Sequence, residues 1–331
     1  NIVNCFSGIL KSLVFIITHL KFRKIQKEKY ILGVDALNDQ TPQDDNTYLV
    51  KNVVKNTDDL LFVFRGEDGK KIGKKLFKNI RVCTINDGEI NILNFYKVCY
   101  SIAKDTILLF RKLIFKSTSH FSLFWILIFE NVRYKIFFEK FETKCFFGRD
   151  EYSFVAHIRT LELRKRNNLS LGLMHGYPPN GIKLNLKYVD FDIYYVFGDL
   201  MKELYIKTWA KNMVVKSIGS WRLRKEYKIG TNVERPNNIV YFNSESVNQN
   251  YITKEIFKLA KYYKDRIIYF KPKSNSGRIS YWENHFNQFL KIPDNIVIEY
   301  GNDPFKFMGK SSYAISHNST VLLETIHFGL I

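Results

Sequence analysis

The 331-residue sequence is poor in cysteine and lacks the short glycine-rich signatures of common nucleotide-dependent enzymes. Its four cysteines are scattered and form no Cys-x-x-Cys pair, which argues against a cysteine metal site and against a disulfide framework. We expect buried free thiols in a reducing compartment. The sequence contains neither a P-loop nor a Gly-x-Gly-x-x-Gly fingerprint, which disfavours kinases and dehydrogenases. The cysteines are Cys5, Cys83, Cys99 and Cys145.

Acidic residues are also scarce, with 32 Asp and Glu against 51 Lys and Arg, a formal net charge of +19. Such a balance is typical of proteins that bind nucleic acid or anionic membranes. However, Lys, Asn, Ile, Phe and Tyr are abundant together, as an A/T-rich coding sequence would produce. The sequence shows no RNA-binding or helix-turn-helix signature, so we expect no specific nucleic-acid partner. A basic surface equally suits nucleotide phosphates or the inner membrane leaflet.

The two most apolar runs are both short for a membrane span. Residues 5–20 are interrupted by Lys11 and lack a following small-residue cleavage site, so they predict a buried or interfacial helix. The basic cluster at 21–29 suits either anionic lipid or a solvated helix end. Residues 121–129, FSLFWILIF, end at Glu130 and favour core burial over membrane contact. We expect a cytoplasmic protein, with peripheral contact to the inner face of the plasma membrane left open.

Short runs of β-branched and aromatic residues alternate with segments of helical periodicity along the chain. This alternation predicts an α/β fold with parallel sheets covered on both faces. Hydrophobic residues make up 46% of the chain, enough for two domains with full cores. We predict domains at 1–221 and 238–331, joined by a charged linker at 222–237. The predicted strands are 30–35, 60–64, 80–85, 144–147, 170–174, 194–197, 213–218, 239–242, 266–270, 295–299 and 313–316.

A turn rich in glycine and proline follows the predicted strand 170–174 and begins with His175. Its prolines and glycines fix an irregular backbone that displays His175 at the carboxyl end of the strand, where open α/β sheets place their chemistry. The pKa of an ordinary histidine suits proton transfer near neutral pH, so His175 is a candidate general base. The alternative is a histidine that only bonds the backbone of its turn.

The stretch 311–329 predicts a strand at 313–316, a polar turn, and a helix at 321–328. The first backbone N–H groups of this helix, with Asn318, Ser319 and Thr320, suit a phosphate, although an ordinary capped helix start explains them equally well. We expect an apolar face to pack and the opposite face to look out of the turn, with Glu324 near a ribose hydroxyl. The expected packed residues are Leu322, Leu323, Ile326 and Leu330.

Two lysines, Lys271 and Lys273, flank Pro272 after the predicted strand 266–270. They suit phosphate neutralisation, and the alternative is a pair of solvated strand-end lysines. Turns of chemical interest thus follow predicted strands in both halves of the chain.

These turns and their order resemble the GT-B transferases of bacterial surface polymers, over residues 144–329. In particular they resemble the CDP-glycerol glycerophosphotransferase family and related capsule and surface-carbohydrate glycosyltransferases. The His-Gly-x-Pro turn of His175, Gly176 and Pro178 matches the family's turn with its proposed catalytic base. Residues 317–320 stand where that family has Asp-Tyr-Ser-Ser, and 271–273 where it has Lys-x-His-Pro. The histidine of Lys-x-His-Pro and the aspartate of Asp-Tyr-Ser-Ser are absent from this sequence. We therefore carry over the fold and the transferase class but not the donor.

The resemblance implies two Rossmann-like domains facing across a cleft, the first on the acceptor side and the second binding the nucleotide donor. We expect the second domain to be truncated. The implied activity is metal-independent transfer of a sugar or polyol phosphate from a nucleotide sugar or CDP-polyol to a growing polysaccharide or lipid-linked acceptor. The donor is the substrate, and no cofactor is implied. The alternative is a non-catalytic GT-B-derived scaffold at the membrane surface.

The implied site has three sets of residues. His175 is the catalytic base, and its loop is supported by Gly176, Tyr177 and Pro178. The residues implied to bind the donor and its phosphates are Lys271, Lys273, His317, Asn318, Ser319, Thr320 and Glu324.

Overall fold

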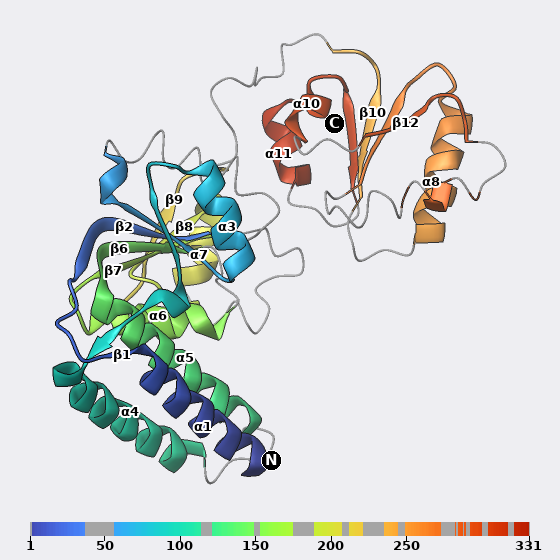
Figure 1. Cartoon of the computed structure of the whole chain (residues 1–331). Helices are drawn as coiled ribbons and strands as arrows, with labels where there is room; N and C mark the ends of the chain where they lie inside the picture. The colour runs from blue at the N-terminus through green and yellow to red at the C-terminus, as the bar shows by residue number, and fades with distance from the viewer. Residues whose placement is uncertain are drawn as a thin grey trace. The chain divides into compact units, whose positions relative to one another are not determined.

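A computed structural model separates the chain into two compact units, Asn1–His175 with Asn180–Gly219, and Gly176–Pro179 with Ser220–Ile331. Each unit is built on its own parallel sheet (Figure 1), which confirms the predicted α/β fold with two Rossmann-like domains. Most of the predicted linker lies outside the described residues, so the boundaries at 221 and 238 stay predictions. The structure describes residues 2–36, 56–113, 121–148, 153–174, 189–206, 212–220, 235–243, 249–272, 282, 284–286, 288, 292–299, 304–316 and 321–330.

The sheet of the first unit has seven parallel strands in the order β4-β3-β2-β6-β7-β8-β9. The chain runs outward from β2 to β4, returns to β6 on the other side of β2, and continues outward to β9. Its direction of winding therefore reverses between β2 and β6. The strands are β2 (Glu28–Ala36), β3 (Leu60–Phe64), β4 (Arg81–Thr84), β6 (Phe141–Gly148), β7 (Leu169–Leu173), β8 (Ile193–Val196) and β9 (Val214–Ser217). A short pair, β1 (Leu20–Lys21) and β5 (Ile90–Asn91), lies apart from this sheet.

Strand β3 shows why this sheet is covered on both faces, because all five of its residues are apolar and buried. Leu61 and Val63 belong to a core cluster with α5 (Phe121–Lys140) and α6 (Phe154–Arg164). Phe62 packs edge-on against Phe77, with ring centroids 4.8 Å apart, at the end of α3 (Glu67–Leu76). A strand that is buried on both faces shows no alternation of polar and apolar residues.

Helix α3 was not predicted, because its sequence EDGKKIGKKL has no apolar stripe. Its buried residues are two glycines, Gly69 and Gly73. A Cβ atom at Gly73 would lie only 2.4 Å from the Phe64 ring. The absence of side chains is therefore what lets this helix approach the sheet.

Three helices of the first unit form a cluster, in which α1 (Ile2–His19) and α4 (Ile92–Leu113) pack on α5 (Figure 1). The predicted helices at 5–20 and 121–138 are confirmed. Within FSLFWILIF, Ile128 is buried, and Ile126, Leu127 and Phe129 are half-buried. None of the described helices combines the length and the apolar character needed to cross a bilayer. The buried core of the cluster is Ile16, Ile90, Val98, Ile128, Val132 and Ile136.

The sheet of the second unit has four parallel strands in the order β12-β11-β10-β13. Ile239 and Tyr241 of β10 pack with α8 (Gln249–Tyr262). Val240 and Phe242 pack with α10 (Phe305–Met308) and with residues just past α11 (Val321–His327), on the opposite side (Figure 1). Here the winding reverses between β10 and β13. The strands are β10 (Ile239–Phe242), β11 (Ile268–Lys271), β12 (Ile296–Ile298) and β13 (Tyr313–Ser316).

The three cysteines whose side chains are described, Cys83, Cys99 and Cys145, are free thiols, as predicted. Their expected burial holds only for Cys83, since Cys99 and Cys145 are half-buried. Burial raises the pKa of the Cys83 thiol well above its usual range, so this side chain behaves as a core residue.

Replacing Gly88 by Ala should destabilise the first unit, because a Cβ there would lie 2.7 Å from the backbone N and Cα of Phe137 on α5. A helix backbone cannot rotate aside as a side chain can. We expect a loss of about 1–3 kcal/mol in the free energy of unfolding, measured by urea titration. The matched control is Gly198→Ala, where nothing lies within 4 Å of the added Cβ. Equal losses in both variants would contradict this packing.

Candidate functional site

Each sheet has one place where ligand binding is most expected, the carboxyl edge at the reversal of winding. There the connections on either side of the reversal leave the sheet in opposite directions and open a crevice. In the first unit this place lies between β2 and β6, and in the second between β10 and β13. Polar side chains collect at both places.

In the second unit, Asn243, Lys271 and Ser316 line this edge. Phe242 pairs in register with Lys271 on one side and with Ser316 on the other. Asn243 follows directly and donates its backbone N–H to the Lys271 carbonyl at 3.0 Å. Among the described residues, the buried Asn243 Oδ1 and Ser316 Oγ have no hydrogen-bond partner. Because an unsatisfied buried polar atom costs about 1–3 kcal/mol, these two atoms indicate a place for a polar ligand.

Lys271 is the buried cation of this edge, with only 6% of its surface exposed. Its Nζ donates to the Pro272 carbonyl at 2.9 Å. Burial lowers the Lys271 pKa to about 8, partly opposed by the charge of Glu299. The side chain is therefore still mainly protonated at neutral pH. An anion beside it would compensate a charge that has lost most of its water.

The sequence predicts that Glu324 looks out of the turn, but in the structure this residue of α11 faces inward. It is 2% exposed and accepts a hydrogen bond from Ser220 Oγ at 2.7 Å. Leu322 and Ile326, predicted to pack, are instead 36% and 66% exposed. The predicted orientation of this helix was wrong.

The reason lies at the end of α11. The short helix ends before Gly329, whose φ of 69° turns the chain. Phe328 and Leu330, on either side of this glycine, enter the core with Val240 and Phe242. These two anchors fix the rotation of the helix, so that Glu324 faces inward. The prediction of a buried Leu330 holds, and the side chain of Leu323 lies outside the described residues.

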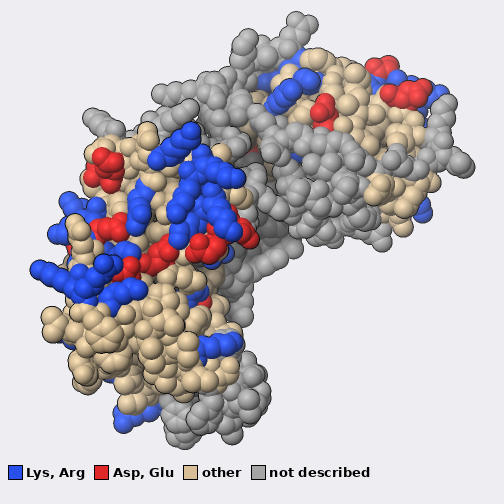
Figure 2. Space-filling model, in the orientation of Figure 1, with Lys and Arg blue, Asp and Glu red and all other residues tan. Residues whose placement is uncertain are grey.

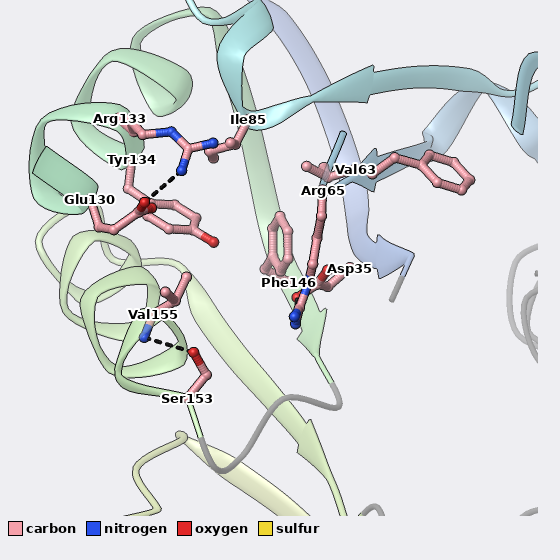
Figure 3. Close-up of a pocket in the computed structure, with 11 residues that line it drawn as sticks. Asp35, Val63, Arg65, Ile85, Glu130, Arg133, Tyr134, Phe146, Ser153 and Val155 are labelled. Carbon is pink, nitrogen blue, oxygen red and sulfur yellow. Dashed lines mark hydrogen bonds and ion pairs between the residues drawn. The ribbon is translucent and has the colours of Figure 1, made fainter. Parts of the chain in front are cut away.

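In the first unit, a pocket of about 150 Å³ opens at the reversal between β2 and β6 (Figure 3). This is smaller than the roughly 300–1,000 Å³ of a typical small-molecule site, so the pocket fits one group of a ligand and not a whole nucleotide. Its lining comes from the ends of β2 and β3, from β6, from α5 and from the start of α6. The lining residues are Asp35, Val63, Phe64, Arg65, Ile85, Glu130, Arg133, Tyr134, Phe146, Ser153 and Val155.

The sheet side of this pocket is held by a buried ion pair. Arg159, which is 1% exposed, places its Nη1 2.9 Å from Asp35 Oδ2. Its guanidinium also lies over the Phe146 ring, 4.9 Å from the centroid. Arg65 Nη2 is 3.6 Å from the same carboxylate oxygen. Removing one partner of such a buried pair leaves an uncompensated charge, so Asp35 is firmly positioned.

The helix side of the pocket carries a second ion pair, between Arg133 Nη1 and Glu130 Oε1 at 2.6 Å (Figure 3). Arg133 Nε also donates to Asn86 Oδ1 at 3.0 Å. Two guanidinium groups and two carboxylates therefore surround the cavity. This lining suits a polar, hydroxyl-bearing group better than an apolar one.

The predicted base, His175, directly follows Met174, whose N–H donates to the Tyr195 carbonyl at 2.9 Å. Because β2, β6 and β7 are parallel, strand β7 ends at the same sheet edge as the pocket, with β6 between β7 and β2. Of the predicted site residues, the described part of the chain includes only Lys271 and Glu324. The others, His175, Gly176, Tyr177, Pro178, Lys273, His317, Asn318, Ser319 and Thr320, lie outside the described residues.

The expectation that the sequence has no Asp-x-Asp motif, which argued against a metal-dependent glycosyltransferase, is wrong, because Asp190 and Asp192 have this spacing. Arg164 binds both carboxylates, with Nη2 2.8 Å from Asp190 Oδ1 and Nε 2.7 Å from Asp192 Oδ1. Both aspartates precede β8 and so lie at the amino edge of the sheet, opposite the pocket. Their charges tie α6 to β8. Within the described residues, no group of three or more His, Cys, Asp or Glu is arranged to hold a metal ion.

Asn243, Ser316, Asp35 and Arg65 are not among the site residues predicted from the sequence. Each stands at or directly after the end of a strand that was itself predicted. Their significance depends on which strands are neighbours, and strand order was the missing information.

Lys271→Met should stabilise the protein at about pH 7 while removing the cation from this edge. Between about pH 8 and about pH 10.5, the wild-type native state binds fewer protons at Lys271 than the unfolded state does. Wild-type stability therefore gains from this group as pH rises through that window. The Met variant lacks this gain, so its advantage of about 1–3 kcal/mol near pH 7 should shrink toward pH 10. Urea titrations at both pH values test this, and an unchanged difference would contradict a buried charged Lys271.

No model of a known protein family matches the sequence, and no curated protein matches it. Solved structures that resemble the chain include UDP-GlcNAc 2-epimerase from Neisseria meningitidis, with 11% identity and a TM-score of 0.47, covering 88% of this chain and 77% of that one. Acinetobacter baumannii MurG has 12% identity and a TM-score of 0.46, covering 91% and 76%. Anabaena HepE in complex with UDP has 12% identity and a TM-score of 0.45, covering 91% and 79%. At these values the likeness assigns no activity to this chain.

Proposed function

We propose that this chain is a GT-B-type transferase that uses a nucleotide-activated donor. It moves a sugar or polyol phosphate to a hydroxyl of a surface polysaccharide or lipid-linked acceptor, without a metal ion. One observation carries the proposal. At the reversal of the second sheet, the buried cation Lys271 stands at the same register level as Phe242 and Ser316, and two buried oxygen atoms of this edge, Asn243 Oδ1 and Ser316 Oγ, lack partners among the described residues.

The chemistry of this edge favours a nucleoside diphosphate. The diphosphate oxygens would compensate the desolvated charge of Lys271, and the Ser316 hydroxyl would donate to one of them. Asn243 Oδ1 would accept from a hydroxyl of the ribose or of the transferred group. We assign further phosphate contacts to Lys273 and to the turn His317, Asn318, Ser319 and Thr320, because these follow β11 and β13 directly in the sequence. Glu324 acts in this proposal as a positioning residue through Ser220.

In the proposed reaction, His175 removes the proton of the acceptor hydroxyl as its oxygen attacks the donor. The new bond forms to the sugar carbon or to the polyol-bearing phosphorus. The bond to the leaving nucleotide phosphate breaks, and Lys271, Lys273 and the 317–320 turn stabilise the negative charge that the leaving group gains. Gly176, Tyr177 and Pro178 hold the loop that presents His175.

We assign the acceptor to the first unit. The pocket at its sheet reversal offers Arg65 and Arg133 as donors and Asp35 and Glu130 as acceptors of hydrogen bonds. Its volume of about 150 Å³ fits a single acceptor group. The pocket lies at the sheet edge where β7, the strand that precedes His175 in the sequence, also ends.

The first test of this proposal is a thermal-shift screen of the purified chain against CMP, CDP, UDP, GDP and ADP. We expect one nucleotide to raise the melting temperature, since a ligand at 100 times its Kd stabilises by about 2.7 kcal/mol. Ser319→Ala with Thr320→Ala should weaken that shift by at least about tenfold in apparent affinity. Thr18→Ala, in the exposed end of α1, is the control and should leave the shift unchanged.

His175→Ala separates binding from transfer. This variant should keep the nucleotide-induced shift and lose donor turnover by about 10²-fold or more. Retention of turnover would remove His175 from the reaction. If no nucleotide stabilises the folded chain, the non-catalytic scaffold becomes the better account.

A further inference from the structure

Helix α1 has a burial pattern opposite to the one expected of a surface helix in water. Its inward face carries Gly8, Ser12 and Ile16, and Ser12 Oγ donates to the Gly8 carbonyl at 2.9 Å. Its outward face is apolar over two turns. A soluble helix normally shows the reverse pattern. The outward residues and their exposed fractions are Leu10 (62%), Leu13 (49%), Val14 (52%) and Ile17 (65%).

Helix α4, which packs on the same helix α5, shows a second exposed apolar stripe. Val98 faces the core at 6% exposure, while side chains spaced by three, four and seven residues form a stripe on the outer surface. These are Leu93 (78%), Tyr96 (72%), Tyr100 (74%) and Ile107 (54%). We call the two stripes together the α1/α4 surface.

The charges beside the α1/α4 surface have one sign. Lys97, Lys104 and Arg111 are exposed at intervals of seven residues along α4, and Lys11 is exposed on α1. The only carboxylate in the described part of these two helices is Asp105, which is half-buried and bonded to Lys135 Nζ and Asn131 Nδ2 at 2.5 and 3.0 Å. Figure 2 shows the lower part of the first unit as mainly tan with isolated blue groups.

From this juxtaposition we infer that the α1/α4 surface binds the interface of a bilayer that contains anionic phospholipids. The aliphatic side chains would enter the boundary between headgroups and acyl chains, and the tyrosines would sit at headgroup level. The lysines and Arg111 would meet the lipid phosphates. The exposed Phe22, at 84%, and the cations Arg23 and Lys24 follow α1 and extend the same chemistry. This inference does not depend on the transferase proposal.

A second copy of the chain fits this surface less well. A symmetric dimer brings the same patch of each copy together. It would place the cationic row of Lys97, Lys104 and Arg111 against its equivalent, and no exposed carboxylate in the described part of the two helices compensates these charges. A lipid surface supplies both the apolar layer and the opposite charge.

The test is flotation of the full chain with vesicles of pure phosphatidylcholine and with vesicles of phosphatidylcholine mixed with phosphatidylglycerol. We expect binding to the mixed vesicles that weakens as salt rises. Leu10→Ser/Leu13→Ser/Ile17→Ser and Lys97→Glu/Lys104→Glu/Arg111→Glu should each lower the affinity at least about tenfold. Circular dichroism establishes that each variant is folded.

Two control variants make the same chemical changes elsewhere on the chain. Lys254→Glu/Lys258→Glu/Lys261→Glu reverses three exposed charges on α8. Leu161→Ser/Leu200→Ser/Val214→Ser replaces three side chains that are 52%, 61% and 51% exposed. Both should bind like the wild type. Equal losses in test and control variants, or no binding to mixed vesicles, would overturn the inference. A dimer that the α1 substitutions convert to monomer, with no vesicle binding, would assign the surface to a second copy.

Discussion

The whole arrangement depends on one constraint, that parallel strands carry all of their carboxyl ends to the same edge of a sheet. A connection must then cross a face of the sheet to begin the next strand, and the point where the crossing direction reverses leaves an open crevice. The first unit has this point between β2 and β6, and the second between β10 and β13. Polar side chains stand at or just past strand ends at these points, with Asp35 on β2, Asn243 after β10 and Ser316 on β13, although strands such as β3 and β10 are apolar on both faces.

The two sheet edges differ in how their buried charges are compensated. At the first edge, Arg159 and Asp35 compensate each other, so the pair fixes structure and leaves the pocket walls rigid. At the second edge, Lys271 donates only to a carbonyl within the described residues, and its pKa is lowered by burial. A buried lysine whose pKa is lowered by the loss of water is typical of a site that binds an anion. This contrast is why we place the donor phosphates in the second unit.

Local sequence predicted the strands well, because strands buried on both faces, such as β3 and β10, are continuous apolar runs. It failed at α3, where the packing face is made of glycines that leave no apolar signal. It also failed for α11, because helical periodicity shows which residues share a face but not which face turns inward. That choice depends on Phe328 and Leu330, which lie beyond the helix.

The candidate site was predicted only in part, because local sequence does not show which strands become neighbours. The position of Lys271 at a strand end followed from the sequence, but its burial and its place at one sheet edge with Asn243 and Ser316 did not. These depend on β13 returning to pair with β10 after β12 has been added at the far side. Such non-local pairing is not encoded in any short window of sequence. The predicted roles of His175 and of residues 317–320 stay predictions.

The central claim is that a nucleoside diphosphate binds at the sheet reversal of the second unit. Hydrogen–deuterium exchange of the full chain, with and without the nucleotide that stabilises it most, tests this claim directly. The account predicts slower exchange at amides near the carboxyl ends of β10, β11 and β13, with little change at α8, which covers one face of the same sheet. Protection confined to the first unit, or spread equally over α8, would contradict it.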